Sequence, residues 1–154
     1  MPKETHYPYD FEYSHIVREI KTSVSIYSSR NSTEGKFIKT DAIWDTGATH
    51  SVFSSRIAQK LDLASVDKWT AGGINQVIKT DVVVATIILP NGLKLTEKRF
   101  AICDIPGADV LIGMDIISMG DFVITNARGK TFFSFVIPTL NNKISFHEMV
   151  NIII

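Results

Sequence analysis

The chain has 154 residues, of which 45% are hydrophobic, so it can bury the core of one domain. This composition excludes a chain that is disordered throughout. With 16 basic and 16 acidic side chains, the formal net charge is 0, which argues against broad electrostatic capture of nucleic acid or of an anionic membrane.

Cys103 is the only cysteine of the sequence, so no disulfide can form within the chain, and a reducing compartment is favoured. Residues 1–10 lack the apolar segment of a signal peptide, and no apolar run is long enough to span a bilayer. We therefore expect a cytoplasmic protein with neither a membrane nor a nucleic acid as its partner. Cys103 is expected to be a small buried side chain.

The first half of the chain holds short β-prone segments separated by polar turns. Residues 16–27 alternate in part between apolar and polar side chains, and residues 37–44 and 52–53 are also predicted strands. The inward-facing positions of the first segment are predicted to be Val17, Ile20, Val24 and Ile26. Residues 54–61 show the apolar spacing of a short helix, for which Ser54 is a suitable N-cap.

The second half continues in the same manner. Residues 70–80 are polar and glycine-centred, and residues 81–89 and 94–103 are strands joined by Pro90-Asn91-Gly92, where Asn-Gly tolerates positive φ at both positions. A short strand at 110–112, a short helix at 114–119 and a hairpin formed by 122–125 and 131–137 follow. Many short strands at this spacing favour a closed or sandwiched all-β domain.

The stretch Ala42-Ile43-Trp44-Asp45-Thr46-Gly47 carries the clearest chemical signal. An apolar strand ends in an acid, a hydroxyl residue and a glycine. The strand would deliver the Asp45 carboxylate to a fixed place, Thr46 can hydrogen-bond locally, and Gly47 allows a close approach of other backbone. Taken alone, such a triplet is also common in a turn that merely ends a strand.

Two further features follow in order. Gly72-Gly73-Ile74 lies between two β-prone runs, and Leu111-Ile112-Gly113 precedes the predicted short helix. Each is by itself compatible with a plain hairpin tip or with a core strand that stops at glycine. Together with the acid loop, the three features resemble the retropepsins, the single-domain aspartic proteases of retroviruses and their cellular and bacterial relatives.

The resemblance covers about residues 16–136 and implies a fold and a domain organisation. The fold would be all-β and closed, barrel-like, with one or two short helices, and the protein would act as a homodimer. Residues 16–137 would form the protease-like domain. Residues 1–15 would form an N-terminal arm or an extra strand, and residues 138–154 an extension that could supply a strand to the dimer interface.

The implied activity is that of an aspartic endopeptidase, with a peptide or a protein as its substrate. Two Asp45 carboxylates, one from each subunit, would activate water for hydrolysis, because acid-protease chemistry needs two carboxyls that share a proton and the chain holds one such triplet. Thr46 and Gly47 would support this site. The reaction requires no metal and no cofactor.

The glycine-rich segment would be a flap that closes over the bound peptide. Gly72, Gly73 and Ile74 would contact the substrate, and Val77 and Ile112 could add to the pocket walls. Asp109 and Asp115 are expected to brace the turn near the short helix rather than to react. No metal-ligand spacing links the four histidines, which are His6, His15, His50 and His147.

Two departures from the viral pattern leave alternatives open. Met114 stands where those enzymes have arginine, and Thr49 stands where they often have an acid. A protein-interaction module could therefore keep the fold, hold an extended peptide and lack turnover. A third possibility is an enzyme with a single dedicated substrate.

Overall fold

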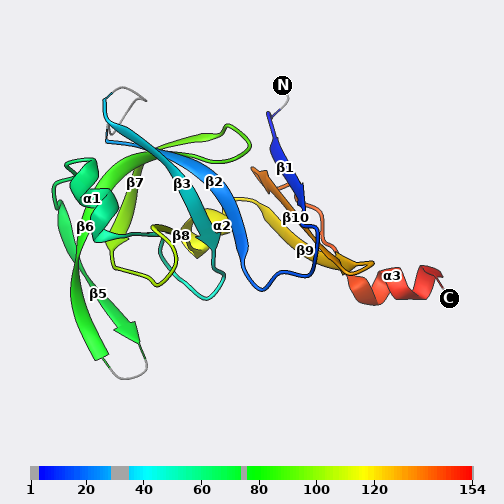
Figure 1. The fold of residues 1–154 in the computed structure, drawn as a ribbon. Coiled ribbons are helices and arrows are strands. Elements are labelled where there is room, and N and C mark those ends of the chain that lie inside the picture. The colour runs from blue at the N-terminus through cyan, green and yellow to red at the C-terminus, as the bar shows by residue number, and fades with distance from the viewer. Residues whose placement is uncertain (1–3, 29–34, 74–75, 154) are drawn as a thin grey trace.

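The computed structural model describes residues 4–28, 35–73 and 76–153 and shows a mainly β protein with two sheets (Figure 1). The strands are β1 Tyr7–Glu12, β2 Ile20–Tyr27, β3 Phe37–Trp44, β4 Val52–Phe53, β5 Asp67–Gly73, β6 Gln76–Ile88, β7 Lys94–Ile102, β8 Val110–Ile112, β9 Asp121–Ala127 and β10 Lys130–Ile137. The helices are α1 Ser55–Lys60, α2 Met114–Ile117 and α3 Phe146–Ile153. The expected all-β class is confirmed.

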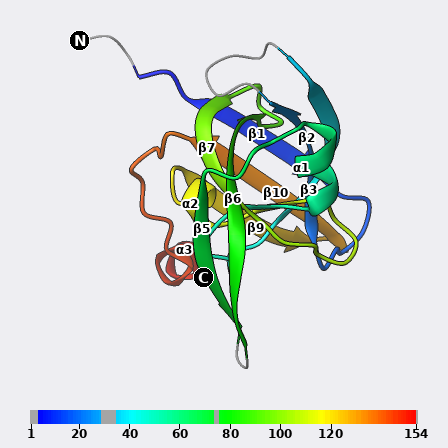
Figure 2. The same ribbon diagram turned by 90° about the vertical axis from the view of Figure 1, so that its left-hand side faces the viewer.

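The larger sheet closes into a barrel. Its strand order is β2-β3-β8-β4-β7-β6-β5, and an additional pairing of β2 with β6 joins its two sides. Strand β5 lies outside this ring and pairs only with β6, so the β5–β6 hairpin extends beyond the barrel (Figure 1, Figure 2). Closure leaves few free strand edges, which is how small all-β domains avoid edge-to-edge association.

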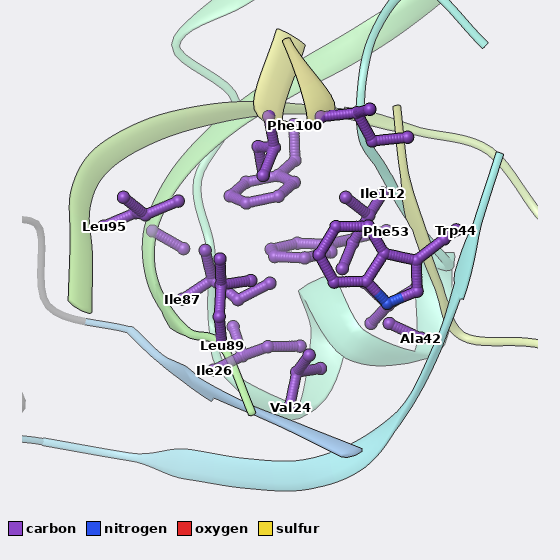
Figure 3. Packing of buried hydrophobic residues seen from close by; sticks show 14 of the residues in the cluster. Val24, Ile26, Ala42, Trp44, Phe53, Ile87, Leu89, Leu95, Phe100 and Ile112 are labelled. Carbon is purple, nitrogen blue, oxygen red and sulfur yellow. The ribbon is translucent and has the colours of Figure 1, made fainter. Parts of the chain in front are cut away.

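The barrel interior follows from the alternation of side chains along its strands. Val17 precedes β2 and is half-buried, so its predicted inward place in the strand is wrong. In β2 the buried positions are Ile20, Thr22, Val24 and Ile26, spaced two residues apart, which confirms the other three predicted inward positions. These side chains meet residues of β3, β6, β7 and β8 in one hydrophobic core (Figure 3). Phe53 and Phe100 stack near its centre, with ring centroids 3.8 Å apart.

A separate three-stranded sheet lies beside the barrel, with the order β1-β10-β9 (Figure 1). Strand β1 pairs with β10 from Tyr7↔Ile137 to Glu12↔Phe132, so residues 7–12 form the extra strand rather than a free arm. The β9–β10 turn places Arg128 and Gly129 at positive φ, which is the backbone of a two-residue hairpin turn. We call these three strands the terminal sheet.

Three local predictions need correction. The described residues contain three helices rather than one or two, because residues 146–153 form α3 instead of a strand. The 90–92 loop has positive φ at Gly92 but not at Asn91, because three residues, not two, lie between Leu89 and Leu93, whose backbones are joined by a hydrogen bond. Cys103 is exposed, since it lies just beyond the end of β7.

The described residues contain no helix long and apolar enough to cross a membrane. Within the same part of the chain, no group of three or more His, Cys, Asp or Glu side chains is arranged to hold a metal ion.

Asp109 directly precedes β8, and its side chain links this strand to α1. Its carboxylate accepts hydrogen bonds from Ser54 Oγ at 2.7 Å and from Arg56 Nε at 2.9 Å, and Arg56 Nη2 forms a second contact. Ser54 also caps α1, as predicted, by accepting a hydrogen bond from the Ile57 N–H. The hydrogen bond from Arg56 lowers the pKa of Asp109 below its ordinary value, so the ionised form is favoured in the folded protein.

We predict that Asp109 makes stability depend on pH in the acid range. Because its pKa is lowered on folding, its contribution is present above about pH 4, the ordinary value of an aspartate, and is lost as the pH falls through the folded-state pKa. Urea unfolding between about pH 2.5 and 6 should give a shallower acid dependence for Asp109→Asn than for wild type. Arg56→Gln should also make the acid dependence of the free energy of unfolding shallower. An equal pH dependence in all three proteins would contradict this role of Asp109.

Candidate active site

The acid loop, residues 45–51, connects two strands that lie on either side of β8. Strand β3 runs parallel to β8, with Trp44 opposite Ile112, and β4 runs antiparallel to it, with Phe53 opposite Val110. The loop must therefore cross over the end of β8, where α2 begins. This topology brings the Asp45 triplet and Gly113 together although they are far apart in the sequence.

Backbone hydrogen bonds hold the loop against the start of α2. The Asp45 N–H donates to the Ile112 carbonyl at 2.9 Å, the Met114 N–H to the Ala48 carbonyl at 2.8 Å, and the Asp115 N–H to the Thr49 carbonyl at 3.2 Å. The first N–H groups of any helix lack partners inside the helix. Here the loop carbonyls supply those partners, so the loop and the helix position each other.

Ser51 and Asp115 add a side-chain connection at the same junction. The Ser51 hydroxyl accepts a hydrogen bond from the Gly113 N–H at 3.0 Å and donates one to Asp115 Oδ1 at 2.7 Å. Ser51 is fully buried, so losing either partner would leave a buried polar group unsatisfied. Asp115 thus braces the loop, as the sequence predicted.

Gly113 is required by space rather than by backbone conformation. A Cβ atom at this position would lie 2.7 Å from the backbone carbonyl carbon and oxygen of His50 and 2.9 Å from the Ala48 carbonyl oxygen. Its φ of −95° is open to any residue. The glycine therefore allows the close approach of the loop to the start of α2.

The Asp45 side chain is half-buried at the beginning of the loop, and its Oδ1 accepts a hydrogen bond from the Gly47 N–H at 2.8 Å. This local bond orients the carboxyl group and leaves Oδ2 for other contacts. A Cβ at Gly47 would lie 3.1 Å from the same Oδ1, so the glycine also gives the carboxylate room. Thr46 and Gly47 are both exposed at the surface.

An open cavity of about 450 Å³ lies between the loop and the base of the β5–β6 hairpin. It is lined by Gly47, Ala48, Thr49, His50, Val52, Trp69, Thr70, Thr80 and Ala101. The His50 and Trp69 rings contact each other with centroids 4.6 Å apart and join the loop to β5. Among these lining residues His50 alone can carry a charge, so the cavity suits an uncharged side chain or an extended backbone.

The predicted flap corresponds to the β5–β6 hairpin. Gly72 pairs with Val77 and Gly73 with Gln76 at its outer end, and Val77 and Ile78 are exposed. Ile74 lies outside the described residues. Ile112 is fully buried in the barrel core, so its predicted place in a pocket wall is wrong.

A family model described as "gag-polyprotein putative aspartyl protease" matches residues 33–119, which include the acid loop, the hairpin and Gly113. The chain belongs to this aspartyl protease family. No curated protein sequence matches the chain.

Several solved structures are similar to this chain. A retropepsin-like aspartic protease from Rickettsia conorii shares 15% sequence identity with a TM-score of 0.53, over 89% of this chain and 98% of that one. EIAV protease in complex with an inhibitor shares 25% identity (TM-score 0.48, 69% and 90% covered). The retroviral protease-like domain of Ddi1 from Leishmania major shares 15% (TM-score 0.48, 77% and 95% covered). The Rickettsia structure confirms the retropepsin fold.

The sequence did not reveal most of the cavity wall. Trp69, Val52 and Ala101 reach it from three different strands, and no periodicity or motif connects them. Only the folded chain places them beside the loop. His50 lies within the loop, but no sequence signal indicates that its ring contacts Trp69.

Gly113→Ala should displace the acid loop. The added methyl group must move the backbone of residues 48–50, and overpacking of this kind destabilises a fold by about 1–3 kcal/mol. Urea unfolding measures that loss, and amide chemical shifts of residues 45–51 report the displacement. Gly92→Ala is the control, because its φ of +80° strains an alanine in open space far from the loop. A Gly113→Ala protein with wild-type stability and unchanged loop shifts would contradict this view.

Proposed function

We propose that this family member is an aspartic endopeptidase that acts as a homodimer, with Asp45 of each subunit forming one active site. The observation that carries the proposal is the intact Asp45-Thr46-Gly47 loop. It is held against the end of β8 and the start of α2 by three backbone hydrogen bonds, and it lies next to a cavity at the base of the β5–β6 hairpin. A pure binding module gains nothing evident from a carboxyl group held in this way.

The need for a second copy follows from the chemistry. Each chain provides one loop of this type, whereas the reaction requires a carboxylate and a carboxylic acid together. Thr46 and Gly47 are exposed, so the loop of a second subunit can approach the first about a twofold axis. Thr46 would then support the pair by hydrogen bonds across the dimer, and Gly47 would admit the neighbouring backbone.

The mechanism uses the two carboxyl groups as a general base and a general acid. Like charges a few Å apart resist joint ionisation, so one carboxyl keeps its proton. The ionised carboxylate takes a proton from a water molecule, which attacks the scissile carbonyl carbon, while the neutral carboxyl donates its proton to the carbonyl oxygen. The carboxyl group that took the proton from water then donates it to the nitrogen, and the other carboxylate takes a proton from a hydroxyl group of the tetrahedral intermediate. The C–N bond breaks, which releases an amine and a carboxylic acid.

Substrate would bind as an extended strand between the loop and the β5–β6 hairpin. Backbone hydrogen bonds would hold such a peptide, and alternate side chains would enter pockets. The cavity beside His50 and Trp69 has the size for one large side chain. Gly72 and Gly73, at the outer end of the hairpin, would close over the peptide, and Ile74 would contact it as well.

Asp45→Asn should abolish peptide cleavage and leave the fold and the dimer intact. An amide cannot act as the general base, so we expect a loss on the order of 10³-fold or more in turnover. The measurement is cleavage of a diverse peptide library from about pH 4 to pH 7, the range in which paired carboxyl groups work. Asp41→Asn is the matched control, since Asp41 is exposed on β3, four residues before Asp45.

The outcomes separate the two functional classes. Cleavage by wild type and Asp41→Asn but not by Asp45→Asn supports the endopeptidase and defines its specificity. If Asp45→Asn cleaves as fast as wild type, the mechanism is wrong. A folded wild-type dimer that binds extended peptides without cleaving any of them would favour the catalytically silent binding module, which the Met114 and Thr49 departures leave open.

A further inference from the structure

Trp44 is the last residue of β3 and directly precedes Asp45. Its side chain is 5% exposed and points into the barrel, in the same part of the core as Phe53 and Ile112 (Figure 3). Its backbone pairs with Ile20 on one side and with Ile112 on the other. The indole is therefore attached to the backbone position that directly precedes Asp45.

The indole also forms the aromatic contact between the barrel and the terminal sheet. Its ring centroid lies 4.6 Å from that of Phe135, 5.3 Å from Phe133 and 5.9 Å from Phe122. The three phenylalanines belong to β9 and β10, whereas Trp44 belongs to the barrel. Edge-to-face and tilted aromatic contacts at these distances prefer particular ring orientations, so they restrict where the indole can lie.

A hydrogen bond fixes the remaining freedom of the ring. The Trp44 Nε1–H donates to Thr22 Oγ1 at 2.8 Å, and Thr22 is 4% exposed. A buried indole N–H without an acceptor would be costly, so this bond selects one orientation of the side chain. Trp44 is thus held by β2, by β8 and by the terminal sheet at once.

We propose that Trp44 is a positioning residue, through which the terminal sheet sets the place of the Asp45 carboxyl group. This role of Trp44 rests on the proposed function, in which the Asp45 carboxyl group takes part in catalysis. The sharing of a proton between two carboxyl groups depends steeply on their separation. A displacement of about 1 Å in a catalytic group can reduce a reaction rate by about 10²-fold. An ordinary core tryptophan would affect stability and nothing at Asp45.

The first test follows the Asp45 carboxyl group itself, so it does not depend on turnover. The ¹³C chemical shift of Asp45 Cγ is recorded against pH for the full-length dimer, and Asp45→Asn identifies the signal. Trp44→Leu removes the aromatic contacts, Trp44→Phe removes the N–H, and Thr22→Val removes its acceptor. Each should move the titration midpoint of Asp45 Cγ by about half a pH unit or more.

Phe100→Leu is the matched control, because it removes another buried aromatic ring of the core, stacked on Phe53 at 3.8 Å. It should lower the melting temperature about as much as Trp44→Leu and leave the Asp45 curve unchanged. Unchanged Asp45 curves in the folded Trp44→Phe and Thr22→Val proteins would overturn the proposal. So would an equal displacement of the curve in Phe100→Leu.

The second test uses cleavage kinetics. Trp44→Leu should lower kcat on the order of 10-fold or more per folded dimer, with KM nearly unchanged, and should alter the pH profile. Phe100→Leu should keep the wild-type kcat and pH profile. If the wild-type protein cleaves no peptide, the proposed function fails, while the Asp45 Cγ titration still decides the role of Trp44.

Discussion

The peptide N–H groups at the start of α2 donate hydrogen bonds to carbonyl groups of the acid loop, and the position of Asp45 depends on these bonds. A helix of four residues cannot stabilise itself, and its first N–H groups need partners from outside. The loop would otherwise be an exposed connection between two strands. Gly113 makes these hydrogen bonds possible, because any side chain at this position would collide with the backbone of residues 48–50.

Barrel closure provides the rigid frame for this junction. Because β3 and β4 lie on both sides of β8, the loop that connects them has to cross the point where α2 begins. The terminal sheet then packs on the barrel through Trp44, whose neighbour in sequence is Asp45. The site thus combines one loop, one short helix and two sheets. The short sequence motifs that the chain shares with the family do not by themselves predict this arrangement.

Much of this architecture could be predicted because the local signals agree with the global fold. Residues 37–44 and 110–112 form strands with the predicted bounds, and Ser54 caps α1. Each of these signals is local, since alternation, capping and glycine placement act within a few residues. The acid loop and Gly113 were recognised by their order along the chain.

The errors concern features that local signals do not determine. The isoleucine-rich C-terminus is compatible with a strand, but Phe146, Met149 and Val150 have the i, i+3, i+4 spacing of a helix, and these residues form α3. The pairing of β1 with β10 and the contact of His50 with Trp69 join residues that are distant in sequence, so only the folded chain shows them. Residue type alone predicts that Cys103 is buried, whereas its place beyond β7 leaves it exposed.

The central claim is that one active site requires Asp45 from two chains, and mixing subunits tests it most directly. Wild-type protein at constant concentration is mixed with increasing Asp45→Asn protein, and cleavage is measured after subunit exchange is complete. If each site needs two Asp45 residues, the activity per wild-type chain falls in proportion to the wild-type fraction of all subunits, because mixed dimers are inactive. Activity per wild-type chain that stays constant as mixed dimers form would contradict the account.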